Sequence, residues 1–158
     1  MAAPPRKRVV WLHPAAKPVL FVLSVTPIAW LVWAAAQDNL GANPAEALIR
    51  ALGIWALRFL CATLAVTPLR VTLGIAALAR FRRMLGLFTY AYVVLHLLAY
   101  AWFDMGLDAS DIARDIAKRP FILVGFASFL LLTPLAATSF NRAVKAVGAV
   151  RWRRLHQA

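Results

Sequence analysis

The stretch MLGLFTYAYVVLHLLAYAWF, residues 84–103, contains no Asp, Glu, Lys or Arg, and His96 is its single histidine. A helix of about 20 apolar residues, rising roughly 1.5 Å per residue, spans a hydrocarbon core of about 30 Å. An ionisable side chain at membrane depth is costly, so His96 marks a candidate functional site. Imidazole is also the side chain that most readily ligates a metal or haem iron inside an apolar bundle.

The composition of the 158-residue chain is that of an integral membrane protein, because 63% of its residues are hydrophobic and its mean hydropathy is +0.72. Soluble domains contain about 45–50% apolar residues. The length predicts one transmembrane domain over residues 1–158. The net charge of +12 does not indicate nucleic-acid binding, because Lys and Arg cluster between the apolar runs and form no stripe along a helix.

The single cysteine, Cys61, lies within an apolar run, where it is expected to pack as a small residue. One thiol cannot build a disulfide, a zinc site or an iron–sulfur cluster. A redox cofactor would therefore be held through histidine or without covalent ligation.

Four apolar runs predict an all-α integral membrane helical bundle with four transmembrane helices. The runs cover about residues 18–36, 52–69, 84–103 and 121–138. The basic aromatic segment RWRRLH, residues 151–156, is typical of sequences that enter a further membrane helix from the cytoplasm, and it predicts the start of a fifth helix.

The charges between the runs predict the orientation. The N-terminal tail, the segment 70–83 and the tail after residue 138 are strongly basic, whereas the segments 37–51 and 104–120 also carry acids. Because cytoplasmic loops are enriched in Lys and Arg, we expect the N-terminus to be cytoplasmic. A cleaved signal peptide ending near residue 36 is the alternative, but the apolar stretch is long for one and carries two tryptophans near the supposed cut, which favours a retained helix.

Arg58 in the second run and His96 in the third are expected at one level in the outer half of the bilayer. Three interpretations stay open. His96 could bind haem iron while Arg58 contacts a haem propionate; the pair could form a proton-relay or transport site; or both could be structural, with Arg58 reaching the headgroups and His96 bonding a neighbouring helix. His13, in the basic N-terminal segment, is assigned no role.

An ordered set of short motifs runs through the chain from residue 41 onward and resembles the MsrQ family, haem-binding membrane subunits of the bacterial periplasmic methionine-sulfoxide reductase system. The motifs are GANP (41–44), LRFL (57–60), LAVTPLR (64–70), RRMLGL (82–87), LH (95–96), KRP (118–120), LTPL (132–135), TS (138–139) and RWRRLH (151–156).

The resemblance implies a ferric-reductase-like inner-membrane protein that binds haem b and is associated with FMN. It implies an electron-transfer subunit, not the catalytic one, which takes electrons from quinone or a cytosolic flavin reductase. The acceptor would be a periplasmic molybdopterin-containing reductase that repairs oxidised methionines, and the acidic segment 104–115 is expected to dock it. His96 matches the third-helix haem ligand of the family, and His156 matches the first of two fifth-helix histidines.

Members of the family continue through a fifth and a sixth helix, and their second fifth-helix histidine lies about thirteen residues after the first, roughly 20 Å further through the membrane. We expect His96 and His156 to lie on opposite sides of the bilayer. The chain is therefore predicted to bind haem substoichiometrically and in a high-spin state. A small transporter or proton-relay protein, or a non-functional fragment, is the alternative.

Overall fold

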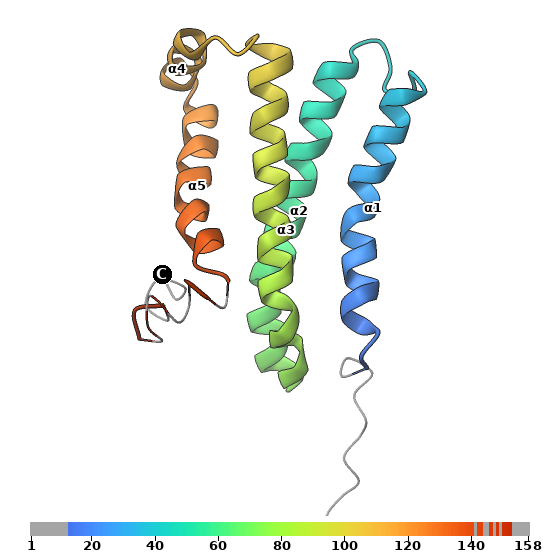
Figure 1. The fold of residues 1–158 in the computed structure, drawn as a ribbon, viewed down its shortest axis with the longest axis vertical. Coiled ribbons are helices and arrows are strands. Elements are labelled where there is room, and N and C mark those ends of the chain that lie inside the picture. Colours follow the sequence, from blue (N-terminus) through green and yellow to red (C-terminus); the bar gives the residue numbers. More distant parts are fainter. Residues whose placement is uncertain (1–12, 141, 144–145, 147, 149, 153–158) are drawn as a thin grey trace, which may run out of the picture.

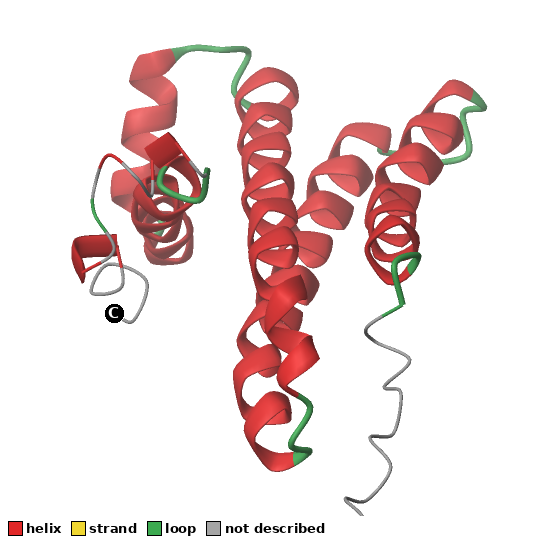
Figure 2. Ribbon diagram, turned by 60° about the horizontal axis from the view of Figure 1, so that its bottom comes forward, coloured by secondary structure: helices red, strands yellow, loops and turns green. Residues whose placement is uncertain are grey.

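The computed structural model describes residues 13–140, 142–143, 146, 148 and 150–152. These residues form helices and their connections, and no strand occurs among them (Figures 1 and 2). The elements are α1 (Ala16–Ala36), α2 (Pro44–Thr72), a 3₁₀ turn (Ala76–Leu78), α3 (Ala79–Ala99), a π turn (Tyr100–Asp104), α4 (Ala109–Lys118) and α5 (Pro120–Ala137).

Four helical segments of the described chain are long and apolar enough to cross a membrane, as the sequence predicts. They are Ala16–Ala36, Pro44–Thr72, Ala76–Asp104 and Pro120–Ala137. Helix α2 begins at Pro44, before the apolar run of residues 52–69, because Asn43 caps it by accepting a hydrogen bond from the Glu46 N–H at 3.3 Å, and Pro44 fits the first helical turn. The predicted all-α membrane bundle is confirmed.

Helices α2 and α3 run antiparallel at the centre of the molecule, with α1 on one side and α5 on the other (Figure 1). The α1–α2 and α3–α4 connections lie at the same end, and the 3₁₀ turn between α2 and α3 lies at the opposite end. The connections therefore alternate between the two ends of the bundle, as the loop charges predict. Of the segment 151–156, which is predicted to begin a fifth helix, Arg151 and Trp152 are described and helical, and His156 lies outside the described residues.

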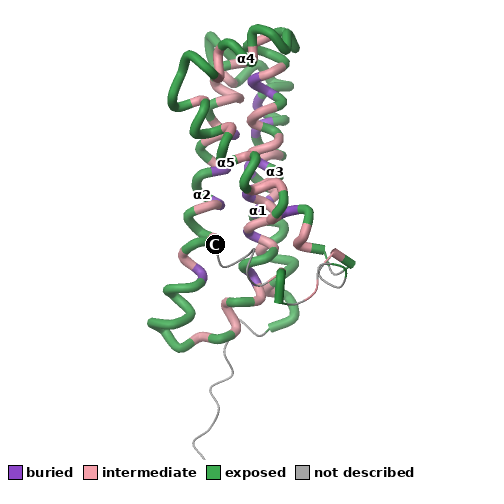
Figure 3. The backbone as a smooth tube through the Cα atoms, turned by 90° about the vertical axis from the view of Figure 1, so that its left-hand side faces the viewer, coloured by how far each residue is buried: buried purple, intermediate pink, exposed green. Residues whose placement is uncertain are grey.

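The core lies between α1, α2 and α3 and combines aliphatic side chains with the rings of Phe59, Phe81 and Tyr92. Tyr92 is fully buried, and its ring centroid is 5.0 Å from that of Phe59. Its hydroxyl donates to the carbonyl oxygen of Ser24 in α1 at 2.8 Å. Pro27 lies one turn further along α1, where its missing N–H interrupts the helical bonding. Tyr92 thus links α3 to α1 next to the point where Pro27 interrupts the helical bonding. Figure 3 shows that few residues are buried and that most of the chain is exposed or half-buried.

Two features differ from the sequence expectation. The segment between the third and fourth spans contains the ten-residue helix α4, which turns its half-buried Ile112 and Ile116 toward the protein. Four charged positions outweighed this short apolar stripe in the hydropathy pattern, so no helix was predicted there. Cys61 is exposed on α2 and does not pack in the core, because it lies on a different face of the helix from Phe59 and Ala56.

Candidate functional site

His96 is held against α2 in the half of the bundle that adjoins α4. The imidazole is half-buried, and its Nδ1 lies 2.9 Å from the carbonyl oxygen of Ile49. A carbonyl oxygen only accepts, so Nδ1 carries the proton, and in the neutral ring the lone pair is on Nε2. Histidines that bind metals are typically oriented by such a bond from the other ring nitrogen.

The ring also lies on Gly53, one helical turn after Ile49. A Cβ placed on residue 53 would be 3.1 Å from both Cε1 and Nδ1 of His96, and 3.7 Å from Nε2. The side chain of any other residue would therefore press on the imidazole. The proton fixed on Nδ1, the lone pair on Nε2 and the space cleared by Gly53 together fit an imidazole that ligates iron through Nε2.

Arg58 is not brought to His96. It lies five residues beyond Gly53, which corresponds to about 7.5 Å along α2 and about 140° around it. Its side chain is exposed, and the guanidinium covers the ring of Trp55 at 4.6 Å from the centroid. The sequence places Arg58 and His96 at one level by counting from residue 52. Because α2 begins at Pro44, Arg58 lies further along the helix than the residues that contact His96.

The other histidines do not join this site in the described structure. His13 lies at the opposite end of the bundle, where its Nδ1 accepts the Ala15 N–H at 3.2 Å. His156 lies outside the described residues. Among the residues that are described, no group of three or more His, Cys, Asp or Glu side chains could hold a metal ion.

Next to the histidine, an apolar groove of about 300 Å³ opens between α1, α2 and α3. Its lining includes Leu48, Leu52 and Leu95, which directly precede Ile49, Gly53 and His96 in the chain. His96 does not line the groove. The site is therefore flanked on this side by hydrocarbon, which lowers the local dielectric and limits access of water.

A polar cluster closes the same end of the molecule. The Tyr100 hydroxyl donates to Asp115 Oδ2 at 2.7 Å, and Arg119 Nε lies 2.9 Å from the other carboxylate oxygen. The Asp115 side chain is only 12% exposed. These contacts attach α4 to the π turn that follows His96, a connection that the sequence did not reveal because its partners lie on separate elements.

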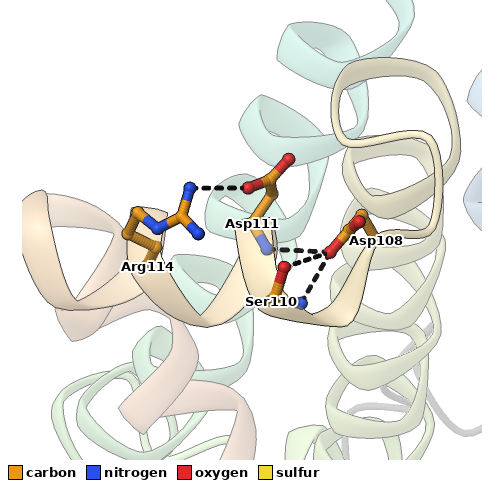
Figure 4. Close-up of polar contacts among 4 residues, drawn as sticks. All are labelled: Asp108, Ser110, Asp111 and Arg114. Carbon is orange, nitrogen blue, oxygen red and sulfur yellow. Dashed lines mark hydrogen bonds and ion pairs between the residues drawn. The ribbon is translucent and has the colours of Figure 1, made fainter.

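The first turn of α4 is stabilised by its own acids (Figure 4). Asp108 accepts hydrogen bonds from the Ser110 hydroxyl at 2.6 Å and from the N–H groups of Ser110 and Asp111 at 2.8 and 3.1 Å. The Ser110 hydroxyl, followed by these N–H groups, lowers the pKa of the Asp108 carboxyl below its usual value. Asp111 pairs with Arg114 at 2.9 Å, so the outward face of α4 carries both signs of charge.

Fold and site together define a multi-pass helical membrane protein with an oriented histidine between two of its spans. The family described as the ferric reductase like transmembrane component matches residues 52–158. The chain is 69% identical over 158 residues to the protein-methionine-sulfoxide reductase heme-binding subunit MsrQ of Polaromonas naphthalenivorans, covering 99% of this chain and 72% of that protein. No solved structure matches the chain.

Two further relatives carry the same name. The Azospira oryzae protein is 51% identical over 91% of this chain and 62% of its own length, and the Ralstonia nicotianae protein is 50% identical over 90% of this chain and 66% of its own length. The chain thus spans about two thirds of the length of these relatives. It belongs to the MsrQ family within the ferric reductase like transmembrane class, which confirms the resemblance of its ordered motifs.

Sequence reasoning found His96 but missed Ile49 and Gly53, the residues that hold it. A backbone carbonyl has no sequence signal, and an isolated glycine in an apolar run has several explanations. Only the register between α2 and α3 brings these residues together.

Proposed function

We propose that the chain is a haem-b-binding membrane subunit that passes electrons to a methionine-sulfoxide reductase. The observation that carries this proposal is His96, an imidazole within a membrane span whose Nδ1 is engaged by Ile49 and whose Nε2 is left for a metal. The relatives are named as heme-binding subunits of such a reductase, which supports the same assignment. The role is electron transfer and not catalysis.

Haem would supply a one-electron couple at membrane depth. The protein's own contribution is to hold and insulate that group. His96 would ligate through Nε2, while the Ile49 carbonyl fixes the tautomer and raises the basicity of the ring. The leucine-lined groove beside the site excludes water and keeps the surroundings apolar.

Two further residues are proposed to bind haem, His156 by the family resemblance and Arg58 by its charge. His156 is proposed as a ligand of haem iron, but not of the iron at His96, because the two histidines are expected on opposite sides of the bilayer. Arg58 is the proposed partner of a haem propionate. An exposed guanidinium stacked on Trp55 has its charge free to compensate a carboxylate in low dielectric. We expect Arg58→Gln to reduce haem loading without changing the type of axial ligand, whereas Arg58→Lys retains most of it.

The same resemblance supports the remaining assignments. The protein would lie in the inner membrane with a cytoplasmic N-terminus, bind FMN, and receive electrons from quinone or a cytosolic flavin reductase. Its partner would be a periplasmic, molybdopterin-containing catalytic subunit. Reporter fusions after Arg83 and Arg142 should report the cytoplasm, and a fusion at Asp108 should report the outside; a cytoplasmic signal at Asp108 would reverse the proposed orientation.

Docking of the catalytic subunit is proposed at α4, whose Asp108 and Asp111 are exposed at the end of the bundle near His96. Because Asn also caps helices, Asp108→Asn and Asp111→Asn remove charge while keeping the helix. Both changes should weaken the salt dependence of association, and Lys118→Gln on the same helix should not. Unchanged salt dependence in the Asn variants would place the docking surface elsewhere.

A reduced-minus-oxidised optical spectrum of the purified protein tests the central proposal. Haem bands should appear, His96→Ala should abolish them, and His13→Ala should leave them intact because His13 lies at the other end of the bundle. A protein without haem bands after reconstitution would favour a transporter or proton-relay role. Haem bands that survive His96→Ala would show that another residue is the ligand.

A further inference from the structure

Residues 49 and 53 lie on the same face of α2, one turn apart, and both contact the same imidazole. Ile49 contributes its carbonyl oxygen, which accepts the Nδ1 proton at 2.9 Å. Gly53 contributes the absence of a side chain, because a Cβ there would stand 3.1 Å from Cε1 and Nδ1. The hydrogen bond and the clearance are therefore two parts of one arrangement.

A Cβ contact of this length is too tight for the ring to stay where it is. The imidazole would have to move away from α2 by a few tenths of an ångström. Because Ile49 is on the same helix, this movement also withdraws Nδ1 from the Ile49 carbonyl and weakens the bond that fixes the tautomer. A methyl group at residue 53 would thus disturb the orientation of Nε2 without touching it directly.

We propose that Gly53 is the positioning residue for His96: it lets the imidazole lie on α2, donate through Nδ1 to Ile49, and offer Nε2 to the haem iron. The last step rests on the proposed haem function. The orientation and tautomer of the ring do not, and they can be measured without haem.

The other glycines within the spans show that the tight contact is particular to residue 53. A Cβ on Gly86 of α3 would lie 3.7 Å from Thr63 Cγ2, an ordinary van der Waals distance, and a Cβ on Gly125 of α5 would meet nothing within 4 Å. Gly86 is half-buried at the same α2–α3 interface as Gly53. Gly86→Ala is therefore a matched control that adds the same methyl group and the same helix propensity.

The first experiment titrates haem into the purified full chain and its variants in detergent, and follows the Soret band. Gly53→Ala should weaken the apparent affinity by about tenfold or more, the range seen when groups that orient a metal ligand are lost, and should shift the band. Gly86→Ala should stay close to the wild-type affinity. Equal affinities and spectra for wild type, Gly53→Ala and Gly86→Ala would overturn the proposal.

The second experiment needs no haem. With His13 and His156 replaced by Gln, His96 is the only histidine, and its ¹⁵N chemical shifts report the tautomer of the neutral ring. The apo protein should show the Nδ1–H form. Gly53→Ala should add a substantial share of the Nε2–H form, and Gly86→Ala should not. An apo ring that is already in the Nε2–H form, or that Gly53→Ala leaves unchanged, would overturn the proposal.

A double substitution separates a clash with the ring from a general intolerance of residue 53. If Gly53→Ala lowers stability or prevents folding because the methyl presses on the imidazole, then adding His96→Ala should restore folding. A double variant that still fails to fold would overturn the proposal, because the ring is then not the group that requires glycine.

The two hypotheses fail in different ways. A wild-type chain that takes up no haem, but whose tautomer responds to Gly53→Ala, refutes the proposed function and leaves the positioning role intact. A chain that binds haem through His96 with an unchanged tautomer and affinity in Gly53→Ala refutes the positioning role alone.

Discussion

The α2–α3 pair and the α3–α5 pair are both antiparallel neighbours, yet they are joined in different ways. Along α2–α3, the Thr63 and Thr89 hydroxyls lie 3.3 Å apart, Phe59 and Tyr92 are buried, and two glycines face the partner helix. Along α3–α5, the half-buried Tyr90 and Phe129 stack at 6.0 Å. Most other large side chains of α5 point outward.

The difference shows what a ligand site in a membrane requires. In a membrane, an apolar side chain gains little by packing against another helix instead of against lipid. The close approach of two helices therefore depends on small residues and on side chains whose shapes fit together. The α2–α3 interface has both, and it is there that His96 is fixed by two contacts. The α3–α5 interface has few such contacts, and the candidate site does not depend on it.

The largest effect is expected from the centre of the tight region. Tyr92→Ala should destabilise the bundle by about 3 kcal/mol or more, because it leaves a cavity between three helices and removes the bond to Ser24. Tyr92→Phe should cost about 1 kcal/mol, since only the hydroxyl is lost. Unfolding by SDS in mixed micelles measures both, and equal costs would mean that the ring contributes no packing.

An intermediate effect is expected where α4 meets the π turn. Asp115→Ala removes the acceptor of Tyr100 and the partner of Arg119, at a cost of about 1–2 kcal/mol that is confined to α4. Hydrogen exchange of the α4 amides should speed up while exchange in α2 and α3 stays unchanged. Asp111→Ala is the control, because Asp111 and Arg114 are both more than half exposed and the loss of their pair should be negligible.

The loose pair should respond less than the tight one. Phe129→Ala removes the stacking on Tyr90 and should cost about 1 kcal/mol, with no change in haem affinity. The measurement is the same SDS unfolding, together with the haem titration. A cost as large as that of Tyr92→Ala would remove the distinction between the two interfaces.

The smallest effect is a local pH dependence of α4. The pKa of Asp108 is lowered by its hydrogen bonds, so its cap contributes stability above the ordinary carboxyl pKa of 3.8 and loses that contribution as the pH falls below it. Exchange of the amides of Ser110 and Asp111, corrected for intrinsic rates, should accelerate at acid pH. Asp108→Asn should abolish this pH dependence, and an unchanged acid response in that variant would exclude the cap as its cause.

The sequence by itself determined the number of spans, their order, the alternation of their connections and the presence of an imidazole at membrane depth. These follow from hydropathy because a backbone in lipid must satisfy its own hydrogen bonds, which leaves an apolar run little choice but a helix. The family could also be recognised, since its motifs follow one another along the chain.

The tertiary structure alone decided which faces of these helices meet. Helices that are apolar all round show no periodicity that marks an inner side, so neither the exposure of Cys61 nor the outward position of Arg58 was visible in the pattern. The contacts of His96 depend on the register of α2 against α3, which is set by side-chain packing across the interface. The sequence showed that a histidine lies in the membrane, but packing decided that a carbonyl and a glycine hold it.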